Sequence, residues 1–231
     1  LLNGTKNWIT NGGTASCYLV MAQTDPAKGS KGINCLIVEK DWPGVVVAAK
    51  ENKLGIRGSD THTVMFNDVK VPKANRIGED GFGFKFAMKT LAGGRIGIAS
   101  QALGIASGAY ELAKEYAKTR KAFGTEIMNH QAIAFKLADM ATKIEAARLL
   151  CLKAAWEKDQ HIDYTLSSSM AKVYASETAM WTAVEAVQVH GGYGFVKEYH
   201  VERLMRDAKI TQIYEGTSEV QRIVISRAIL K

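Results

Sequence analysis

The composition of the chain changes near residues 73–80, and this break constrains the fold more than any other feature. Before it, short runs rich in β-branched and aromatic residues alternate with turn signals, which is typical of antiparallel strands in a sandwich or barrel. After it, long stretches are poor in proline and rich in alanine, leucine and methionine, which is helical composition. The sequence therefore predicts a β-domain over residues 1–73 and a helical domain over residues 74–231.

The β-domain is expected to contain five strands separated by glycine- and proline-containing turns. The expected strands are Lys6–Thr10, Tyr18–Gln23, Ile33–Glu39, Val45–Lys50 and Thr63–Val71. The turns are Asn11-Gly12-Gly13, Lys28-Gly29-Ser30 and Trp42-Pro43-Gly44. These residues supply the positive or fixed φ angles that turns require.

Two apolar stripes at helical spacing are expected to form the core of the second domain. The first consists of Ile133, Leu137, Met140, Ile144, Ala147 and Cys151, and the second of Met170, Val173, Met180, Val184 and Val187. Stripes of this kind are typical of helices that pack in a bundle. The predicted class is α+β, with an antiparallel β-domain followed by an up-down four-helix bundle.

Composition excludes several classes of protein. No apolar run approaches the ~20 residues of a membrane-spanning helix, and three cysteines without a CxxC pair indicate neither a disulfide framework nor a zinc site. The net charge of +7 is compatible with nucleic acid, an anionic membrane or a phosphate-rich ligand. Because the basic residues are scattered among acidic ones, a solvated surface is the simplest interpretation.

The segment Thr211–Arg222 is the most informative for function. Ser218 and Gln221 have the spacing of a capping box, so a final helix is expected to begin here and to run toward Leu230. Glu215 and Gly216 then lie on the turn before that helix, where free N–H groups can bind an anion or a polar ligand. Alternatively, Glu215 is only an acid favoured by the helix dipole.

Three further segments could bind a ligand or serve structure alone. The run Gln188–Gly194 ends a helix with adjacent glycines, as a C-cap turn does. Arg120 and Gln131 offer a guanidinium and an amide near a helix break, which suits phosphate recognition. Trp8 and Thr10 place an aromatic ring and a hydroxyl on one face of a strand, which could equally be packing.

Together these segments resemble the acyl-CoA dehydrogenase family in order and approximate register, over essentially the whole chain. The resemblance also rests on Gly55-Ile56-Arg57-Gly58-Ser59-Asp60-Thr61, Phe66-Asn67-Asp68-Val69-Lys70-Val71-Pro72, Gly94-Arg95-Ile96, His130-Gln131 and Lys136-Leu137-Ala138-Asp139-Met140. Membership of this family implies a fold of β-domain and helical bundle, a bound FAD and assembly as a homotetramer.

The resemblance assigns roles to individual positions. It implies that Glu215 is the catalytic base and that Gly216 and Arg95 contact substrate. The positions matching FAD contacts are Trp8, Ile9 and Thr10 beside the flavin ring, Arg120 and Gln131 at the pyrophosphate and adenosine arm, Gln188, Val189, His190, Gly191 and Gly192 toward a neighbouring subunit's FAD, and Thr217, Ser218 and Glu219 at the last helix.

The implied reaction is the α,β-dehydrogenation of an acyl-CoA thioester to the trans-2-enoyl-CoA. Glu215 removes the α-proton and flavin N5 accepts the β-hydrogen as hydride, while hydrogen-bond donors hold the thioester carbonyl. In other branches of the family the base comes from the position held here by Gly94. Glu215 together with Gly94 therefore favours short- to medium-chain substrates, although Ala92 stands where the short-chain branch commonly has an aspartate.

The family's N-terminal helical domain and early β-strands have no counterpart in residues 1–231. We therefore expect the chain to be part of a longer protein whose upstream residues cover the acyl pocket, and residues 1–231 alone to be a poor catalyst.

Two alternatives remain open from the sequence. Acyl-CoA oxidase shares the fold but returns electrons to oxygen. A non-catalytic or nucleic-acid-binding relative is also compatible with the basic charge, although loss of the Glu215 base would be its expected mark. For the dehydrogenase, the resemblance implies electron-transferring flavoprotein as acceptor and a bacterial cytoplasm or mitochondrial matrix as location, with no metal, nucleic acid or membrane as partner.

Overall fold

The computed structural model describes residues 1–230, which form two compact units, residues 1–90 and 91–230. The division falls inside a long helix, α1 (Gly83–Thr119), whose first turns belong to the β-containing unit. The antiparallel sheets followed by a helical region confirm the predicted fold class. Each unit is described by itself below.

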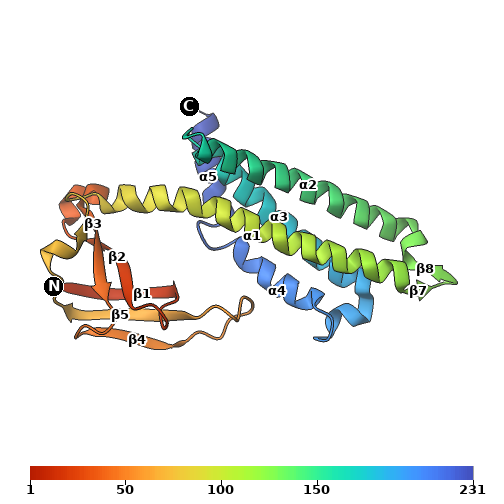
Figure 1. The fold of residues 1–231 in the computed structure, drawn as a ribbon, viewed down its shortest axis with the longest axis horizontal. Helices are drawn as coiled ribbons and strands as arrows, with labels where there is room; N and C mark the ends of the chain where they lie inside the picture. The colour runs from red at the N-terminus through yellow and green to blue at the C-terminus, as the bar shows by residue number, and fades with distance from the viewer. Residues whose placement is uncertain (231) are drawn as a thin grey trace. The chain divides into compact units, whose positions relative to one another are not determined.

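The first unit contains two three-stranded antiparallel sheets, drawn in red to orange in Figure 1. One has the order β1-β5-β4 and the other β2-β3-β6. The strands are β1 (Leu2–Thr10), β2 (Cys17–Gln23), β3 (Ile33–Glu39), β4 (Val45–Lys50), β5 (Thr61–Val69) and β6 (Arg76–Ile77). Short 3-10 helices, η1 (Pro26–Gly32) and η2 (Lys73–Asn75), lie between strands. The β2–β3 register is regular over seven residue pairs, whereas β1–β5 carries bulges.

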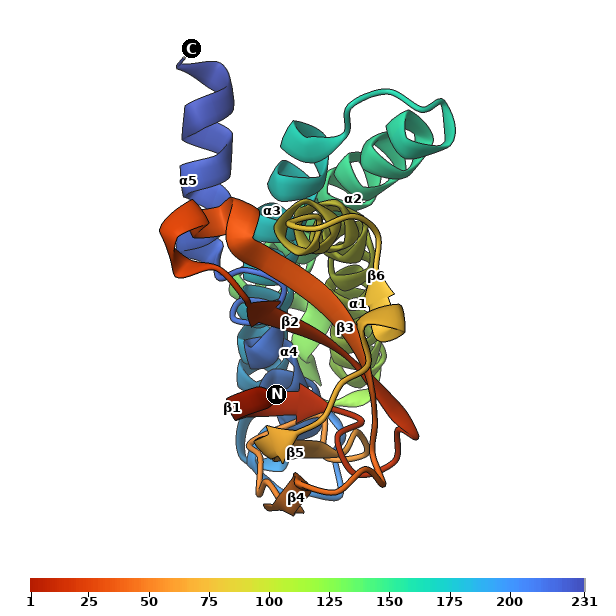
Figure 2. The same ribbon diagram turned by 90° about the vertical axis from the view of Figure 1, so that its left-hand side faces the viewer.

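Apolar side chains from both sheets form one core, which makes the unit a sandwich. Its buried members are Leu2, Tyr18, Val20, Val38, Val64, Phe66 and Val69. The rings of Tyr18 and Phe66 meet edge to face with centroids 6.5 Å apart. Figure 2 shows the strands of both sheets from the end of the molecule.

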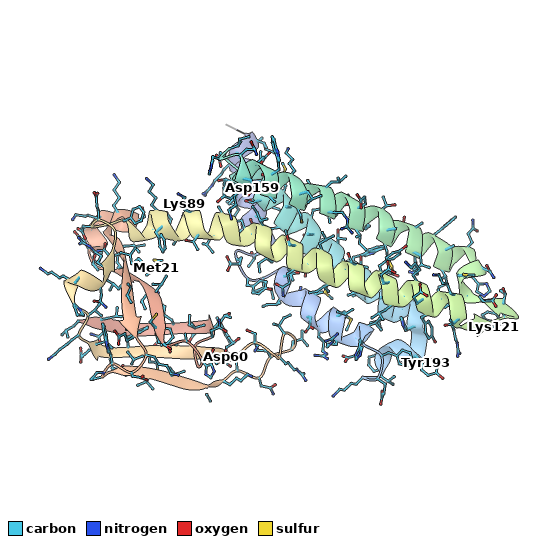
Figure 3. The ribbon with its side chains drawn as sticks, in the orientation of Figure 1. Met21, Asp60, Lys89, Lys121, Asp159 and Tyr193 are labelled. Atoms are coloured by element: carbon cyan, nitrogen blue, oxygen red, sulfur yellow. The ribbon has the colours of Figure 1, made fainter. Side chains whose placement is uncertain are left out.

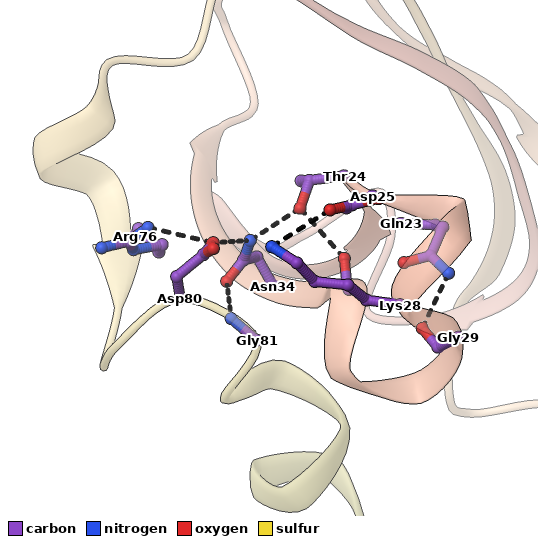
Figure 4. Close-up of polar contacts among 10 residues, drawn as sticks. Gln23, Thr24, Asp25, Lys28, Gly29, Asn34, Arg76, Asp80 and Gly81 are labelled. Atoms are coloured by element: carbon purple, nitrogen blue, oxygen red, sulfur yellow. Dashed lines mark hydrogen bonds and ion pairs between the residues drawn. The ribbon is translucent and has the colours of Figure 1, made fainter.

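A buried asparagine ties the start of α1 to this unit. Asn34 donates from Nδ2 to Thr24 Oγ1 (2.8 Å) and to Asp80 Oδ1 (2.9 Å), and its Oδ1 accepts from the backbone N–H of Gly81 at 2.9 Å (Figure 4). The amide of Asn34 is the largest cause that lowers the pKa of Asp80. These bonds join β3 to the segment that enters the helix, so the first turns of α1 are fixed to the sandwich.

The second unit is helical. Its helices are the remainder of α1, α2 (Gln131–Asp159), α3 (Thr165–His190), α4 (Val201–Thr211) and α5 (Ser218–Ile229). A small hairpin of β7 (Lys121–Ala122) and β8 (Thr125–Glu126), with η3 (Ile127–Asn129), joins α1 to α2, and η4 (Gly191–Phe195) follows α3. The hairpin and the α4–α5 connection lie at opposite ends of this unit (Figure 1).

Small residues form most of the core between the helices. Alanines on α1 and α3 are fully buried at helical spacing; they are Ala99, Ala102, Ala106, Ala109, Ala113 and Ala117 on α1, and Ala171, Ala175, Ala179, Ala183 and Ala186 on α3. The stripe predicted on α2 is confirmed, with Met140, Ile144, Ala147 and Cys151 buried.

The stripe predicted on α3 is confirmed only in part, since Met180 and Val187 pack against the core from its margin. Met170, Val173, Met180 and Val187 are only half-buried and Val184 is exposed, because the face that enters the core carries alanine, serine and threonine instead. Side-chain size, rather than hydrophobicity, selects this face, because small residues let helix backbones approach closely.

Within residues 1–230, no helix is long and apolar enough to cross a membrane. Cys17, Cys35 and Cys151 are all free thiols. Burial raises the pKa of the Cys151 thiol to about 11.

Candidate functional site

The connection between α4 and α5 carries Glu215 on an unusual backbone. Glu215 has φ 54° and Gly216 φ 88°, both in the left-handed region that non-glycine residues seldom adopt. The backbone N–H of Ser218 closes the turn by donating to the carbonyl of Gln212 at 2.9 Å. As predicted, Glu215 and Gly216 lie on the turn that precedes the last helix.

The carboxylate of Glu215 lies against α1 at Gly94. A Cβ atom at position 94 would come within 2.6 Å of Glu215 Oε2, so any larger residue there displaces the carboxylate. Glycine at position 94 and glutamate at position 215 are therefore mutually dependent in this structure.

Arg95 lies next to Gly94 on α1 and is buried. Its Nη1 donates to Ser169 Oγ on α3 at 3.1 Å, while its Nε has no partner among residues 1–230. Burial lowers the pKa of Arg95, and the charge of Glu215 opposes that shift. The predicted base and the predicted substrate-side arginine thus interact electrostatically.

Sequence reasoning missed Lys172 at this turn and assigned Gln221 to a capping box rather than to a contact with the turn. Lys172 Nζ donates to the carbonyl of Gly216 at 2.7 Å, and Gln221 Nε2 donates to the carbonyls of Glu215 (3.1 Å) and Gly216 (3.0 Å). Both side chains are fully buried. Nothing local in the sequence indicates that a lysine on α3 contacts a turn 44 residues away.

The start of α5 differs from the prediction in its capping residue. The N-cap is Thr217, whose Oγ1 accepts from the backbone N–H of Val220 at 3.3 Å, and Ser218 is already helical. Gln221 is therefore one position too late for a capping box. Ser218 Oγ is buried without a hydrogen-bond partner in the described part of the chain.

Glu219 lies in the first turn of α5. Its own backbone amide is the largest cause that lowers the pKa of the Glu219 carboxyl, and the Thr217 hydroxyl adds to that effect. The roles of Thr217, Ser218 and Glu219 as cofactor contacts stay predictions.

The hairpin end of the helical unit carries an open groove of about 470 Å³. We call it the Arg120 groove; its lining residues are Tyr116, Arg120, Ile127, Val189, His190, Gly192, Tyr193 and Val196. Tyr193 and Lys121 mark this end of the helices in Figure 3, and Asp159 marks the other end. Four predicted cofactor-binding positions, Arg120, Val189, His190 and Gly192, are thus brought together.

Aromatic rings form the floor of the Arg120 groove. The guanidinium carbon of Arg120 lies 5.4 Å from the centroid of the Tyr193 ring. His190 stacks on Tyr116 with centroids 4.2 Å apart, and burial lowers the pKa of His190. A planar, negatively charged ligand is complementary to such a surface.

Gln131, Gln188 and Gly191 border this region. Gln131 is the exposed first residue of α2, and the exposed Gln188 accepts at its carbonyl from the N–H of Gly191, which ends α3 at φ 59°. The prediction of a C-cap turn at Gly191 is confirmed. None of the three lines the groove within the described residues.

Trp8, Ile9 and Thr10 lie in β1 of the first unit. Trp8 is 71% exposed with φ 61°, at a bulge between Lys6 and Ile9, while Ile9 packs against the sandwich core. The following turn is held by Tyr18, whose hydroxyl donates to Gly12 O at 2.7 Å, and by Asp60. The bulge thus presents the Trp8 ring to solvent. Because of the bulge, the direction of the ring does not follow from the alternation of side chains in a regular strand.

Two sequence profiles together match almost the entire chain. The acyl-CoA dehydrogenase middle domain matches residues 1–69, and the acyl-CoA dehydrogenase C-terminal domain matches residues 81–230. The chain belongs to the acyl-CoA dehydrogenase family. The predicted resemblance is confirmed.

The chain is similar to dehydrogenases of bacteria and mitochondria. The structure of butyryl-CoA dehydrogenase from Megasphaera elsdenii superposes with a TM-score of 0.97 at 53% identity, covering 99% of this chain and 60% of that one. The mitochondrial short-chain specific acyl-CoA dehydrogenase of Mus musculus is 51% identical over the whole chain, which spans 56% of that protein. The caffeyl-CoA reductase-Etf complex subunit CarC of Acetobacterium woodii is 50% identical, with 61% of its length covered. The chain therefore spans about three-fifths of the length of these relatives.

Proposed function

We propose that the protein containing this chain is an FAD-dependent acyl-CoA dehydrogenase that converts short- to medium-chain acyl-CoA thioesters to trans-2-enoyl-CoA. The identity of about half to short-chain and butyryl-CoA dehydrogenases supports this substrate class. The single observation that carries the proposal is the Glu215 carboxylate, which a left-handed turn holds against Gly94 and beside Arg95.

Glu215 is the base of the proposed reaction. An α-C–H of a thioester is a weak acid, so the base must be fixed in position. Its carboxylate oxygens must also not be occupied by a direct ion pair. In the described residues, the guanidinium of Arg95 is hydrogen-bonded to Ser169, and Lys172 to the Gly216 carbonyl. Neither of these hydrogen bonds uses the Glu215 carboxylate, so its oxygens are free to accept the α-proton.

The Arg120 groove is the proposed site for the diphosphate and adenosine part of an FAD whose flavin is bound by a neighbouring subunit. The guanidinium of Arg120 suits a pyrophosphate, the rings of Tyr193 and His190 suit a planar base, and Gly192 adds no Cβ to hinder close approach. In the helical unit, Ser218 at the start of α5 is a proposed cofactor contact, and in the first unit the exposed ring of Trp8 is another. When bound, FAD accepts the β-hydrogen as hydride, which no side chain of the protein can do.

We further propose that electron-transferring flavoprotein reoxidises the enzyme and that the assembly is a homotetramer. The Acetobacterium woodii relative is named as a subunit of an Etf complex, which supports electron-transferring flavoprotein as a partner. Similarity to both bacterial and mitochondrial dehydrogenases supports a bacterial cytoplasm or a mitochondrial matrix as the location.

Anaerobic titration of the full-length protein with butyryl-CoA and octanoyl-CoA tests the proposal. The flavin absorbance of the parent should bleach, whereas Glu215→Gln should retain FAD and reduce it at least ~10²-fold more slowly, because an amide cannot accept the α-proton. Reoxidation by electron-transferring flavoprotein but not by oxygen separates the dehydrogenase from an oxidase. Complete flavin reduction at the parental rate by Glu215→Gln would falsify the assignment.

A further inference from the structure

Lys172 is a fully buried lysine in the middle of α3, and it contacts the turn that carries Glu215. Removing an ammonium group from water costs several kcal/mol unless the protein supplies replacement interactions. Its hydrogen bond within residues 1–230 goes to the backbone carbonyl of Gly216, at 2.7 Å, rather than to a carboxylate. The free-energy cost of burying the Lys172 ammonium is thus spent on one hydrogen bond, to the Gly216 carbonyl oxygen. This indicates that the position of that carbonyl is important.

The same carbonyl receives a second donor from another helix. Gln221 Nε2, on α5, donates to Gly216 O at 3.0 Å and to Glu215 O at 3.1 Å. A Cβ at position 216 would come within 2.6 Å of this nitrogen, so glycine allows the close approach. Two consecutive carbonyls of the turn are thus held by side chains from α3 and α5.

These bonds act on a backbone that is strained. A left-handed glutamate costs of the order of 1 kcal/mol or more, and such a conformation persists only where its surroundings enforce it. Release of the Gly216 carbonyl would let the peptide between residues 216 and 217 rotate, so that the turn would no longer hold the backbone at Glu215. The Glu215 side chain would then leave its place against Gly94.

We propose that Lys172 is a positioning residue for the base: together with Gln221 it holds the Gly216 carbonyl and so fixes the direction of the Glu215 side chain. This inference rests on the proposed function of Glu215 and adds a residue to it. Lys172 itself touches neither substrate nor cofactor in this role.

The charged groups that act on Lys172 lie on α1, α3, the turn and α5. They are Arg95 on α1, Glu177 on α3, Glu215 on the turn and Glu219 on α5. Burial, the largest cause, and the charge of Arg95 together lower the pKa of Lys172 to about 8, while the three acids oppose the shift. The ammonium is therefore charged at neutral pH, and its bond to Gly216 is the stronger, charge-assisted kind.

The test compares Lys172→Met, which keeps length but removes the donor, with Lys136→Met. Lys136 joins α2 to Glu185 on α3 and provides a matched loss of one lysine contact outside the turn. Lys172→Met should slow flavin reduction by butyryl-CoA by roughly 10²-fold with unchanged FAD content, because small displacements of a base have effects of that size. Lys136→Met should reduce flavin at the parental rate.

Hydrogen exchange provides a readout that does not depend on activity. In the full-length Lys172→Met protein, amides of residues 212–218 should exchange about tenfold faster than in the parent, because one stabilising hydrogen bond is lost. The Lys136→Met control should leave this segment unchanged. If Lys172→Met does not accumulate as folded protein, Gln221→Met removes the other donor to the same carbonyl and is judged by the same two measurements.

The outcomes separate the two proposals. Parental flavin reduction and parental exchange in Lys172→Met, with Glu215→Gln inactive, overturn the positioning role and leave the proposed function standing. Slow reduction without faster exchange at residues 212–218 also overturns it, since Lys172 then acts by another route. If Glu215→Gln is itself fully active, the proposed function fails, and the exchange data alone decide whether Lys172 holds the turn.

Discussion

The two ends of the helical unit hold their charged groups in opposite ways. At the α4–α5 connection, Arg95 and Lys172 are buried, and hydrogen bonds to Ser169 and to a backbone carbonyl hold them. At the hairpin end, the Arg120 guanidinium lies over the ring of Tyr193 in an open groove. Buried cations held by hydrogen bonds suit proton transfer, because proton transfer requires a base in a fixed position. A cation and an aromatic ring in an open groove suit the binding of a ligand.

The first prediction concerns the effect of burial on the pKa of Lys172. The pKa falls from 10.5 to about 8 on folding, so between these values the unfolded chain binds the proton more tightly. The stability of the parent relative to Lys172→Met should therefore rise with pH through this window, by about 3 kcal/mol in total.

Urea unfolding of both full-length proteins at several values between pH 7 and 10.5 provides the measurement. Groups common to both proteins, such as Cys151 with its raised pKa, cancel in the difference. A difference that does not change with pH would mean that Lys172 is no more buried than a surface lysine.

The second prediction separates the position of the base from the stability of the fold. Gly94→Ala should reduce the rate of flavin reduction by roughly 10²-fold, because the new methyl group displaces the Glu215 carboxylate. Its thermal stability should not fall, because alanine favours a helix over glycine by about 1 kcal/mol.

Gly104→Ala is the matched control on the same helix, since a Cβ there meets nothing within 4 Å. Gly104→Ala should be more stable to heat than the parent and should reduce flavin at the parental rate. Equal rates for both variants would show that the carboxylate does not need its observed place.

The third prediction concerns the open end. Arg120→Ala should release FAD at least about tenfold faster on dialysis, since a charged hydrogen-bond partner of phosphate is lost, with little change in the rate of the protein that keeps its flavin. Arg148→Ala removes a surface arginine paired with Glu145 on α2 and should retain FAD like the parent. Parental flavin retention in Arg120→Ala would remove the groove from the proposed cofactor site.

The smallest effect is expected from replacing Tyr193, whose ring lies beneath the Arg120 guanidinium. Tyr193→Leu should speed FAD release by about two- to fivefold, because a partly exposed cation–π contact contributes about 0.5–1 kcal/mol. Tyr110→Leu removes a similar contact, with Lys114 on α1, and serves as the control. An equal effect of both substitutions would indicate general destabilisation rather than a role of the groove.

Local sequence patterns were sufficient for much of the fold. The strands Ile33–Glu39 and Val45–Lys50 have the predicted bounds, and Glu215 lies on the predicted turn. Alternation, turn residues and helical composition are properties of short segments, so they can be read without tertiary information. The two-residue strand β6 was missed because its pairing is too short to leave a pattern.

The errors have a common physical origin in tertiary packing. On α3, hydrophobicity pointed to Met170 and Met180, but close helix approach places Ala171, Ala175 and Ala179 in the core. Ser218 was given the capping role because it has the right type and spacing, yet the chain enters the helix one residue earlier, at Thr217. A lysine in an amphipathic helix normally indicates solvent, so Lys172 could not be found without the turn that it contacts.

The left-handed backbone at Glu215 also bears on how the protein would respond to selection in the laboratory. Glycine and asparagine adopt that conformation with less strain than glutamate does, so replacing Glu215 by either would relieve the backbone of the folded protein. A library screened only for survival of heating would therefore be enriched in variants that have lost the proposed base. Trp8, at φ 61°, should be replaced by glycine or asparagine in such a screen for the same reason. Screens for greater stability should therefore keep Glu215 and Trp8 constant.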